Sequence, residues 1–248
     1  VEFKDMEFVY AGAKEPALKD ISFCAMAGQT IGVIGGTGSG KSTLVNLIPR
    51  FYDAASGQVL VDGTDVREYS LDELRDKTGV VPQKSVLFKG TLRDNMRWGK
   101  QDASDEEIYR ALDTAQAREF VDSKGEGLDL YIDQGGHNLS GGQRQRLTIA
   151  RALVRRPEIL IMDDSASALD FATDARLRKA IRENTGDMTV FIVSQRATTI
   201  KSADTILVLD EGRLAGMGTH KELLKDCQVY REICLSQLSK EEVERDEQ

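Results

Sequence analysis

The most informative part of the sequence reads Gly35-Gly36-Thr37-Gly38-Ser39-Gly40-Lys41-Ser42-Thr43. It fits the pattern G-x-x-x-x-G-K-[ST] and follows the apolar run 30–34, which is typical of a strand. Glycines let the backbone curl so that successive N–H groups point inward at an anion, and the start of a helix adds its positive end. The pattern therefore predicts a phosphate-binding loop between a strand and a helix, with Lys41 on the β- and γ-phosphates and Ser42 on Mg²⁺.

The residues around this loop predict a strand-rich first part of the chain. Alternating apolar residues separated by turns of Gly, Ala and Asp favour strands. We expect these strands at residues 1–10, 18–23, 30–34 and 59–62. One helix, from Lys41 to about Tyr52, is expected to interrupt them.

The middle of the chain changes to a helical period. From about Thr91 to Val154 apolar residues recur at helical spacing, and Ser104 with Glu107 forms a capping box before the run. Continuous apolar segments return at 159–162 and 190–193, with a helix expected at 172–183 between them. This order predicts a βαβ unit of a parallel sheet that is covered on both faces, with a helical subdomain inserted before it.

Composition limits the classes of protein that remain. The chain has 248 residues and 40% apolar content, enough for one domain or one domain with an inserted subdomain. A net charge of −8 without a block of Lys and Arg disfavours nucleic-acid binding. Three cysteines, Cys24, Cys227 and Cys234, are odd in number and lack metal-ligand spacing, so we expect reduced core residues.

The ends of the chain carry two further expectations. No stretch approaches the roughly 18 consecutive apolar residues of a membrane-spanning helix, and no signal-peptide pattern opens the sequence. The sequence starts at Val1 in a strand pattern, so we expect a domain excised from a longer polypeptide, with any membrane part upstream. The last segment, 239–248, is polar and acidic, and we expect a frayed tail.

Two further motifs accompany the phosphate-binding loop. Ile159-Leu160-Ile161-Met162-Asp163 delivers a carboxylate at the carboxyl end of a strand, where α/β sheets place their ligands. Leu139-Ser140-Gly141-Gly142-Gln143 precedes a helical run, and Ser140 with Gln143 forms a capping box there. Two glycines at a helix start favour an anion, so this second site predicts that the chain serves another molecule's nucleotide across a dimer interface.

With these motifs in this order, the chain resembles the nucleotide-binding domain of ABC transporters from Val1 to about Leu238. Residues 35–42 resemble Walker A, 159–163 Walker B and 139–143 the ABC signature. The resemblance implies an α/β fold. It would comprise a P-loop NTPase (RecA-like) core, an N-terminal antiparallel β-subdomain and an inserted α-helical signature subdomain. The implied boundaries are 1–84 and 156–238 for the ATP-binding core with its β-subdomain, 85–155 for the helical subdomain and 239–248 for an acidic tail.

The resemblance also assigns roles to single residues. It implies ATP and Mg²⁺ as cofactors, with Lys41 among the catalytic residues and the adenine stacked on Tyr10. Gln83 would touch Mg²⁺ and the attacking water, and the metal would be held by Ser42, Gln83 and, through water, Asp163. The loop Ser167-Ala168-Leu169-Asp170 would cross to the opposing site of a head-to-tail dimer.

The implied assembly is a transporter at the cytoplasmic face of a membrane. The partners would be a second nucleotide-binding domain and the coupling helices of a transmembrane domain. Phe88-Lys89-Gly90-Thr91-Leu92-Arg93-Asp94-Asn95 resembles the exporter-type segment beside those helices.

The sequence departs from the family pattern at two catalytic positions. Asp164 stands where the family usually has the glutamate that polarises the attacking water, and Gln195 stands where it usually has a histidine. The shorter aspartate carboxylate sits on the order of 1.5 Å back, and a misplacement of about 1 Å can cost about 10²-fold in rate. Gln134 likewise replaces an acid that the family commonly has ahead of the signature.

We interpret these departures as the degenerate half of a heterodimeric exporter. The chain's own site would be slow, while its intact signature, Ser140 to Gln143, would complete a competent site on a non-identical partner. Two alternatives remain open at this point. One is a soluble ABC ATPase of the translation-factor or DNA-repair kind, and the other is a regulatory module that binds ATP with little turnover.

Overall fold

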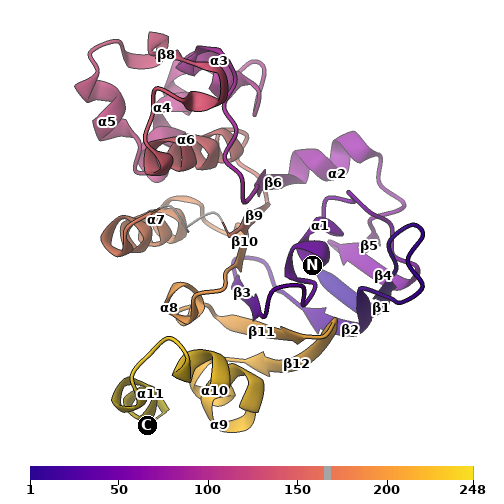
Figure 1. Cartoon of the computed structure of the whole chain (residues 1–248). Helices are drawn as coiled ribbons and strands as arrows, with labels where there is room; N and C mark the ends of the chain where they lie inside the picture. Colours follow the sequence, from indigo (N-terminus) through magenta and orange to yellow (C-terminus); the bar gives the residue numbers. More distant parts are fainter. Residues whose placement is uncertain (165–168, 248) are drawn as a thin grey trace. The chain divides into compact units, whose positions relative to one another are not determined.

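The computed structural model describes residues 1–164 and 169–247, and its fold forms two compact units (Figure 1). The first comprises Val1–Thr78 and Thr189–Gln248, and the second Gly79–Met188. Each is described by itself. Within the described residues, no helix is both long and apolar enough to cross a bilayer.

The first unit contains a four-stranded sheet in the order β2-β1-β4-β5. β1 (Glu2–Phe8) pairs antiparallel with β2 (Leu18–Cys24) and β4 (Ser56–Val61), and β4 pairs antiparallel with β5 (Thr64–Asp65). Phe3 and Phe23 stack at 4.6 Å between ring centroids in the core beneath it. The predicted N-terminal antiparallel β-subdomain is confirmed.

Four further strands of the first unit lie in the order β12-β11-β3-β10. β3 (Thr30–Gly35) pairs in parallel with β10 (Thr189–Val193) and β11 (Thr205–Asp210), while β12 (Arg213–Gly218) runs antiparallel to β11. The continuous apolar runs of β3 and β10 are buried, as expected for strands covered on both faces. The unit also contains the helices α1 (Lys41–Asn46), α2 (Leu71–Lys77) and α8 (Ala197–Ile200).

Two sequence predictions for the strands and the first helix of this unit are wrong. The helix after β3 ends at Asn46 instead of about Tyr52, because Pro49 has no N–H to continue the helical hydrogen bonds and Arg50 has a φ of 55°. Cys24 is exposed at the end of β2, whose alternate residues point away from the core, whereas Cys227 and Cys234 are buried as expected. All three are free cysteines.

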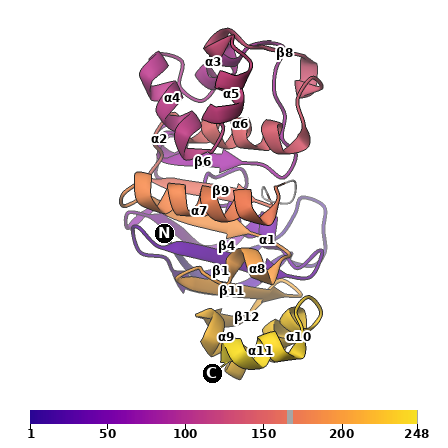
Figure 2. The same cartoon turned by 90° about the vertical axis from the view of Figure 1, so that its left-hand side faces the viewer.

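The C-terminal helices pack together in the first unit (Figure 2). They are α9 (His220–Asp226), α10 (Gln228–Leu235) and α11 (Lys240–Glu247). The predicted frayed tail is wrong up to residue 247, because Val243 is only 1% exposed and Ser239 with Glu242 caps the start of α11. Asp246 also accepts a hydrogen bond from the His220 ring at 3.3 Å.

The second unit combines strands with helices. β6 (Thr78–Val81), which begins at the unit boundary, and β9 (Ile159–Asp163) are sheet neighbours, and α7 (Phe171–Asn184) follows β9 in the chain. Between β6 and β9 lie α3 (Leu92–Arg97), α4 (Asp105–Thr114), α5 (Arg118–Ser123) and α6 (Gly141–Leu153). Short pieces complete the segment: β7 (Gly90–Thr91), β8 (Tyr131–Ile132), and the 3₁₀ turns η1 (Gly127–Asp129) and η2 (Gln134–Gly136).

The helical period predicted for this region is present. Ser104 caps α4 in a capping box with Glu107, and Ile108 and Leu112 are buried on its inner face. The compact unit extends beyond the predicted helical segment 85–155, because β9 and α7 group with these helices. The α/β fold class is confirmed.

Candidate functional site

The phosphate-binding loop of the first unit connects β3 to α1 and is organised around one lysine. The Lys41 side chain is inside the loop, with the residue only 9% exposed. Its Nζ donates to the carbonyl oxygens of Gly35 at 2.9 Å and Gly36 at 2.6 Å, and to Ser39 Oγ at 3.4 Å. The ammonium group is thereby fixed at the centre of the curled backbone, where it can act on a bound anion.

The glycines of the loop fall into two kinds. Gly35 and Gly40 are needed for packing: a Cβ would lie 2.1 Å from the Leu209 carbonyl oxygen at Gly35 and 2.6 Å from Leu18 Cδ2 at Gly40. At Gly36 and Gly38 a Cβ would meet no described atom within 4 Å, so the loop is open on that side. An anion can therefore approach the backbone closely.

The helix that follows offers its positive end to the same space. Gly40, with a φ of 98°, is the N-cap residue of α1, and within the described residues no side chain caps that helix start. The helix dipole and the Lys41 charge both favour an anion there. The Ser42 hydroxyl comes next in the chain, so a phosphate with an associated Mg²⁺ fits these residues.

Tyr10 lies beside the loop, as the resemblance predicts. Its hydroxyl is 2.7 Å from Thr43 Oγ1, and its ring makes edge contacts with Phe8 and Tyr52 at centroid distances of 4.7 and 5.5 Å. The side chain is still 40% exposed. An exposed ring in a fixed position next to a phosphate-binding loop is suited to a planar base.

Gln195 also belongs to the first unit. It follows β10, whose Val193 pairs in parallel with Val33 of β3, so Gln195 and Gly35 leave the sheet at the same edge. Gln195 is exposed, and its carbonyl oxygen accepts a hydrogen bond from Gln237 Nε2 at 2.7 Å. The structure thus brings Gln195 to the sheet edge from which the phosphate-binding loop emerges.

The second unit carries the acidic residues at the end of β9. Asp163 ends the strand and Asp164 follows it in the left-handed region with a φ of 44°, a conformation that aspartate tolerates better than most residues. Gln83 Nε2 donates to Asp164 Oδ2 at 3.3 Å. This pairs two of the predicted catalytic residues across 81 positions of sequence.

The motif Leu139 to Gln143 begins α6. Ser140 Oγ accepts from the Gln143 N–H at 3.2 Å, and Gln143 Oε1 accepts from the Ser140 N–H at 3.0 Å, so the predicted capping box is confirmed. Leu139 is buried and anchors the turn, whereas Gly141 is exposed. The turn therefore presents its backbone to the surface.

The predicted interface loop is described only in part. Ser167 and Ala168 lie outside the described residues. Leu169 is buried, and Asp170 is the N-cap residue of α7, where its carboxylate accepts from the Thr173 N–H at 2.9 Å. That hydrogen bond is the main reason why the pKa of Asp170 lies below its usual value.

Sequence reasoning missed how the exporter-like segment 88–95 is held. Asn95 is fully buried, and its amide bonds the N–H and carbonyl of Phe88 at 2.8 Å each and the carbonyl of Thr91 at 3.0 Å. Phe88 packs on Trp98 at 4.8 Å, and the Arg151 guanidinium lies 5.7 Å from the Phe88 ring centroid. The sequence signal that could have pointed to this segment is Trp98, the single tryptophan of the chain. In the structure its side chain is 70% exposed.

Comparison with known proteins agrees with this geometry. The family model described as ABC transporter matches residues 18–167. An uncharacterised ABC transporter ATP-binding protein of Mycobacterium tuberculosis is 49% identical over 93% of this chain and 40% of its own length. An ATP-dependent lipid A-core flippase of Haemophilus influenzae is 43% identical over 96% of this chain and 41% of its own length.

A solved structure gives the same result for the fold. A bacterial Atm1-family ABC exporter with ATP bound superposes with a TM-score of 0.91 at 37% identity, over 96% of this chain and 42% of that chain. The chain thus spans about two fifths of the length of these relatives. The matched motifs and the fold agree along almost the whole chain, and the chain belongs to the ABC transporter ATP-binding family.

Proposed function

We propose that this chain binds Mg²⁺-ATP through Gly35 to Thr43, with the adenine on Tyr10, and hydrolyses it to ADP and phosphate. The observation that carries the proposal is the buried Lys41 ammonium, held by loop carbonyls at the start of α1 beside open glycine backbone. The family of the chain supports the nucleotide, because its ABC transporter model covers the loop.

The catalytic roles follow from the chemistry of the residues. Asp164 would polarise the attacking water, Gln83 would orient it, and Gln195 would donate a hydrogen bond to the γ-phosphate in place of a histidine. The hydrogen bond from Gln83 to Asp164 supports a joint action of these two. Lys41 would stabilise the charge that develops on the phosphoryl oxygens.

Mg²⁺ would be held by the Ser42 hydroxyl and Gln83 and, through water, by Asp163. When bound, it neutralises phosphate charge and so favours in-line attack. The Asp164 carboxylate is one methylene shorter than the usual glutamate, so we expect slow turnover at this site.

The signature turn would serve a second nucleotide-binding domain. In a head-to-tail dimer, Leu139 to Gln143 and the loop Ser167 to Asp170 would face the partner's ATP. The intact signature beside the substitutions at Asp164 and Gln195 supports a non-identical partner. That partner would carry Glu and His at the equivalent positions and a damaged signature.

The dimer would drive transport, in the direction of export. The similar flippase and exporter support this reading, since both are transporters by their names. The exposed pair of Phe88 and Trp98 supports docking of transmembrane coupling helices at the cytoplasmic face of a membrane. No observation favours the soluble translation-factor or DNA-repair alternative.

Steady-state ATP hydrolysis tests the proposal. The parent chain is compared at high concentration with the double variant Asp164→Glu with Gln195→His, and with a matched control, Asp187→Glu with Gln101→His, at two exposed positions. We expect a nearly silent parent and control and an active double variant. Rapid ATP hydrolysis by the parent would contradict the proposal that its own site is slow and would favour a homodimer. Absence of Mg²⁺-ATP binding would refute the proposed function itself.

A further inference from the structure

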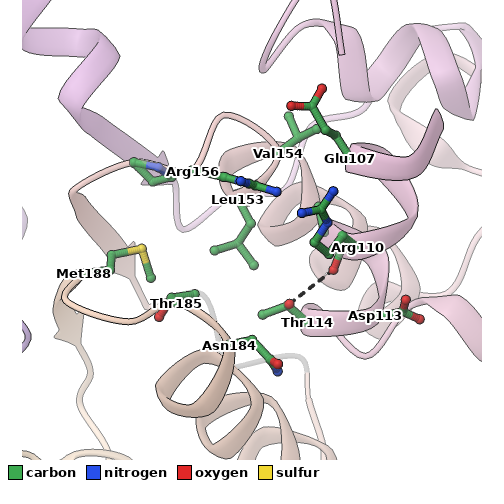
Figure 3. Close-up of a pocket in the computed structure, with 12 residues that line it drawn as sticks. Glu107, Arg110, Asp113, Thr114, Leu153, Val154, Arg156, Asn184, Thr185 and Met188 are labelled. Carbon is green, nitrogen blue, oxygen red and sulfur yellow. Dashed lines mark hydrogen bonds between the residues drawn. The ribbon is translucent and has the colours of Figure 1, made fainter. Parts of the chain in front are cut away.

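A pocket of about 550 Å³ lies in the second unit, away from every residue assigned above (Figure 3). It is formed where α4, α6 and α7 end. Its volume is in the range of small-molecule sites. The apolar part of the lining consists of Ala111, Leu153, Val154, Pro157 and Met188.

The acidic side chains of the lining are already paired. Glu107 accepts from Lys100 Nζ at 2.6 Å and from the Ser104 N–H at 3.0 Å. The hydrogen bond from Lys100 is the main reason why the pKa of Glu107 lies below its usual value. Asp113 lies 3.8 Å from an Arg118 nitrogen. In Figure 3 the Glu107 carboxylate points away from the Thr114 side of the pocket.

The basic side chains of the lining are less engaged. Among the residues that the structure describes, the Arg110 side chain is paired only with the exposed Glu106, at 3.3 Å and one helical turn away, a contact that contributes little in water. Among the described residues, none is paired with the Arg156 side chain by a hydrogen bond or a salt bridge, although its backbone N–H donates to the Leu153 carbonyl at 2.9 Å. The charge of Arg156 makes a smaller contribution to the lowered pKa of Glu107. Figure 3 shows the two guanidinium groups extending toward each other beside the pocket. Both arginines line the same pocket, and guanidinium groups donate charge-assisted hydrogen bonds to an anion.

Three polar side chains at the ends of α4 and α7 bond to their own helices. Thr114 Oγ1 donates to the Arg110 carbonyl at 3.1 Å, Asn184 Nδ2 to the Ala180 carbonyl at 2.8 Å, and Thr185 Oγ1 to the Ile181 carbonyl at 2.5 Å. The basic side chains of the lining are Arg110 and Arg156.

We propose that this pocket binds a small organic acid with a compact apolar body. The body packs on Leu153 and Met188, and the carboxylate, sulfonate or phosphate group lies between Arg110 and Arg156. An occupant would contact α6 at the end opposite its signature turn. The site does not depend on the proposed ATPase activity.

Two matched dyes test the proposal without nucleotide. Anilinonaphthalenesulfonate has an apolar body and a sulfonate, and N-phenyl-1-naphthylamine has the same body without the charge. Fluorescence titrations compare the parent with Arg110→Gln/Arg156→Gln and with a control, Lys124→Gln/Lys179→Gln, which removes two exposed charges outside the lining. The arginine variant is expected to bind the sulfonate at least about tenfold more weakly, because it loses charge-assisted hydrogen bonds. Binding of the uncharged dye should change less than about twofold, and the control should match the parent.

Equal sulfonate affinity in the parent and the arginine variant would overturn the proposal, as would an equal loss for both dyes. Arg110→Lys/Arg156→Lys keeps both charges and guards against misfolding of the glutamine variant. Its affinity for the sulfonate dye should stay within a few-fold of the parent's affinity. A tenfold or greater loss of that affinity in a folded lysine variant would also overturn the proposal. Lys41→Met should weaken ATP binding at least about tenfold and leave the dye titration unchanged, so failure of this site and failure of the ATP site are distinguishable.

Discussion

Two adjacent glycines of the phosphate-binding loop should differ strongly in how much stability is lost on the same substitution. In Gly35→Ala the new Cβ would lie 2.1 Å from the Leu209 carbonyl oxygen, a backbone atom of the strand paired with β3. In Gly36→Ala it would meet no described atom within 4 Å, and the backbone is outside the left-handed region. The neighbouring position therefore provides a control with identical chemistry.

The expected difference follows from these contacts. Overpacking that backbone cannot relieve costs up to about 3 kcal/mol, and disturbing the pairing of Gly35 with Leu209 costs about 1 kcal/mol more. The stiffer unfolded chain offsets about 0.4–1 kcal/mol. Gly35→Ala should thus lose about 3 kcal/mol of unfolding free energy, whereas Gly36→Ala should change it by less than about 1 kcal/mol.

Urea denaturation followed by far-UV circular dichroism measures both variants. With a slope of about 3 kcal/mol per molar urea, Gly35→Ala should unfold at a midpoint about 1 M below the parent. Gly36→Ala should stay within about 0.3 M. Equal midpoints for the two variants would refute the assignment of Gly35 as a packing glycine and Gly36 as an open one.

Three further predictions concern other parts of the chain. Asn95→Ala should lower the unfolding free energy by about 2–4 kcal/mol, because it leaves buried backbone groups of Phe88 without partners. Thermal unfolding measures this loss beside Asn138→Ala, a control at an exposed position. Val243→Ala should lower the unfolding free energy by about 1–2 kcal/mol because Val243 is buried. Val86→Ala, at an exposed position, should leave the unfolding free energy unchanged. Equal losses in the two variants would mean that α11 does not pack against the rest of its unit. The hydrogen bond from Arg67 holds the pKa of Asp65 below 3.8, so its stabilisation is present above the unfolded pKa and lost as pH falls through the folded one. Asp65→Asn should therefore be less stable than the parent at pH 6, and this deficit should shrink below about pH 3.8 in urea titrations at each pH; a constant deficit would contradict the ion-pair account.

Local patterns were sufficient for much of the fold. The apolar runs of β3 and β10 and the capping boxes of α4 and α6 predicted those elements, because each depends on neighbours within a few positions. The capping box of Ser70 and Glu73 is a local signal of the same kind for α2. The end of α1 differs from the prediction because Pro49 breaks the helical pattern before Tyr52.

The rest depends on contacts between distant residues. The capping box of Ser239 and Glu242 is a local signal for the start of α11, whereas the packing of that helix rests on the contact with His220 and on the buried Val243. The hydrogen bond between Gln83 and Asp164 joins segments 81 positions apart. The motif residues could be predicted one by one. The hydrogen-bond partners of Asn95 and the lining of the pocket with Arg110 and Arg156 could be identified only from the structure.

The central claim, that the Gly35 to Thr43 loop binds Mg²⁺-ATP through Lys41, is tested most directly by equilibrium binding. Isothermal titration with Mg²⁺-ATP compares the parent with Lys41→Met and with Lys124→Met, an exposed lysine outside the loop. The account predicts that Lys41→Met weakens binding at least about tenfold, with the fold retained, while Lys124→Met binds like the parent. Equal affinity for ATP in the parent and a folded Lys41→Met would contradict it.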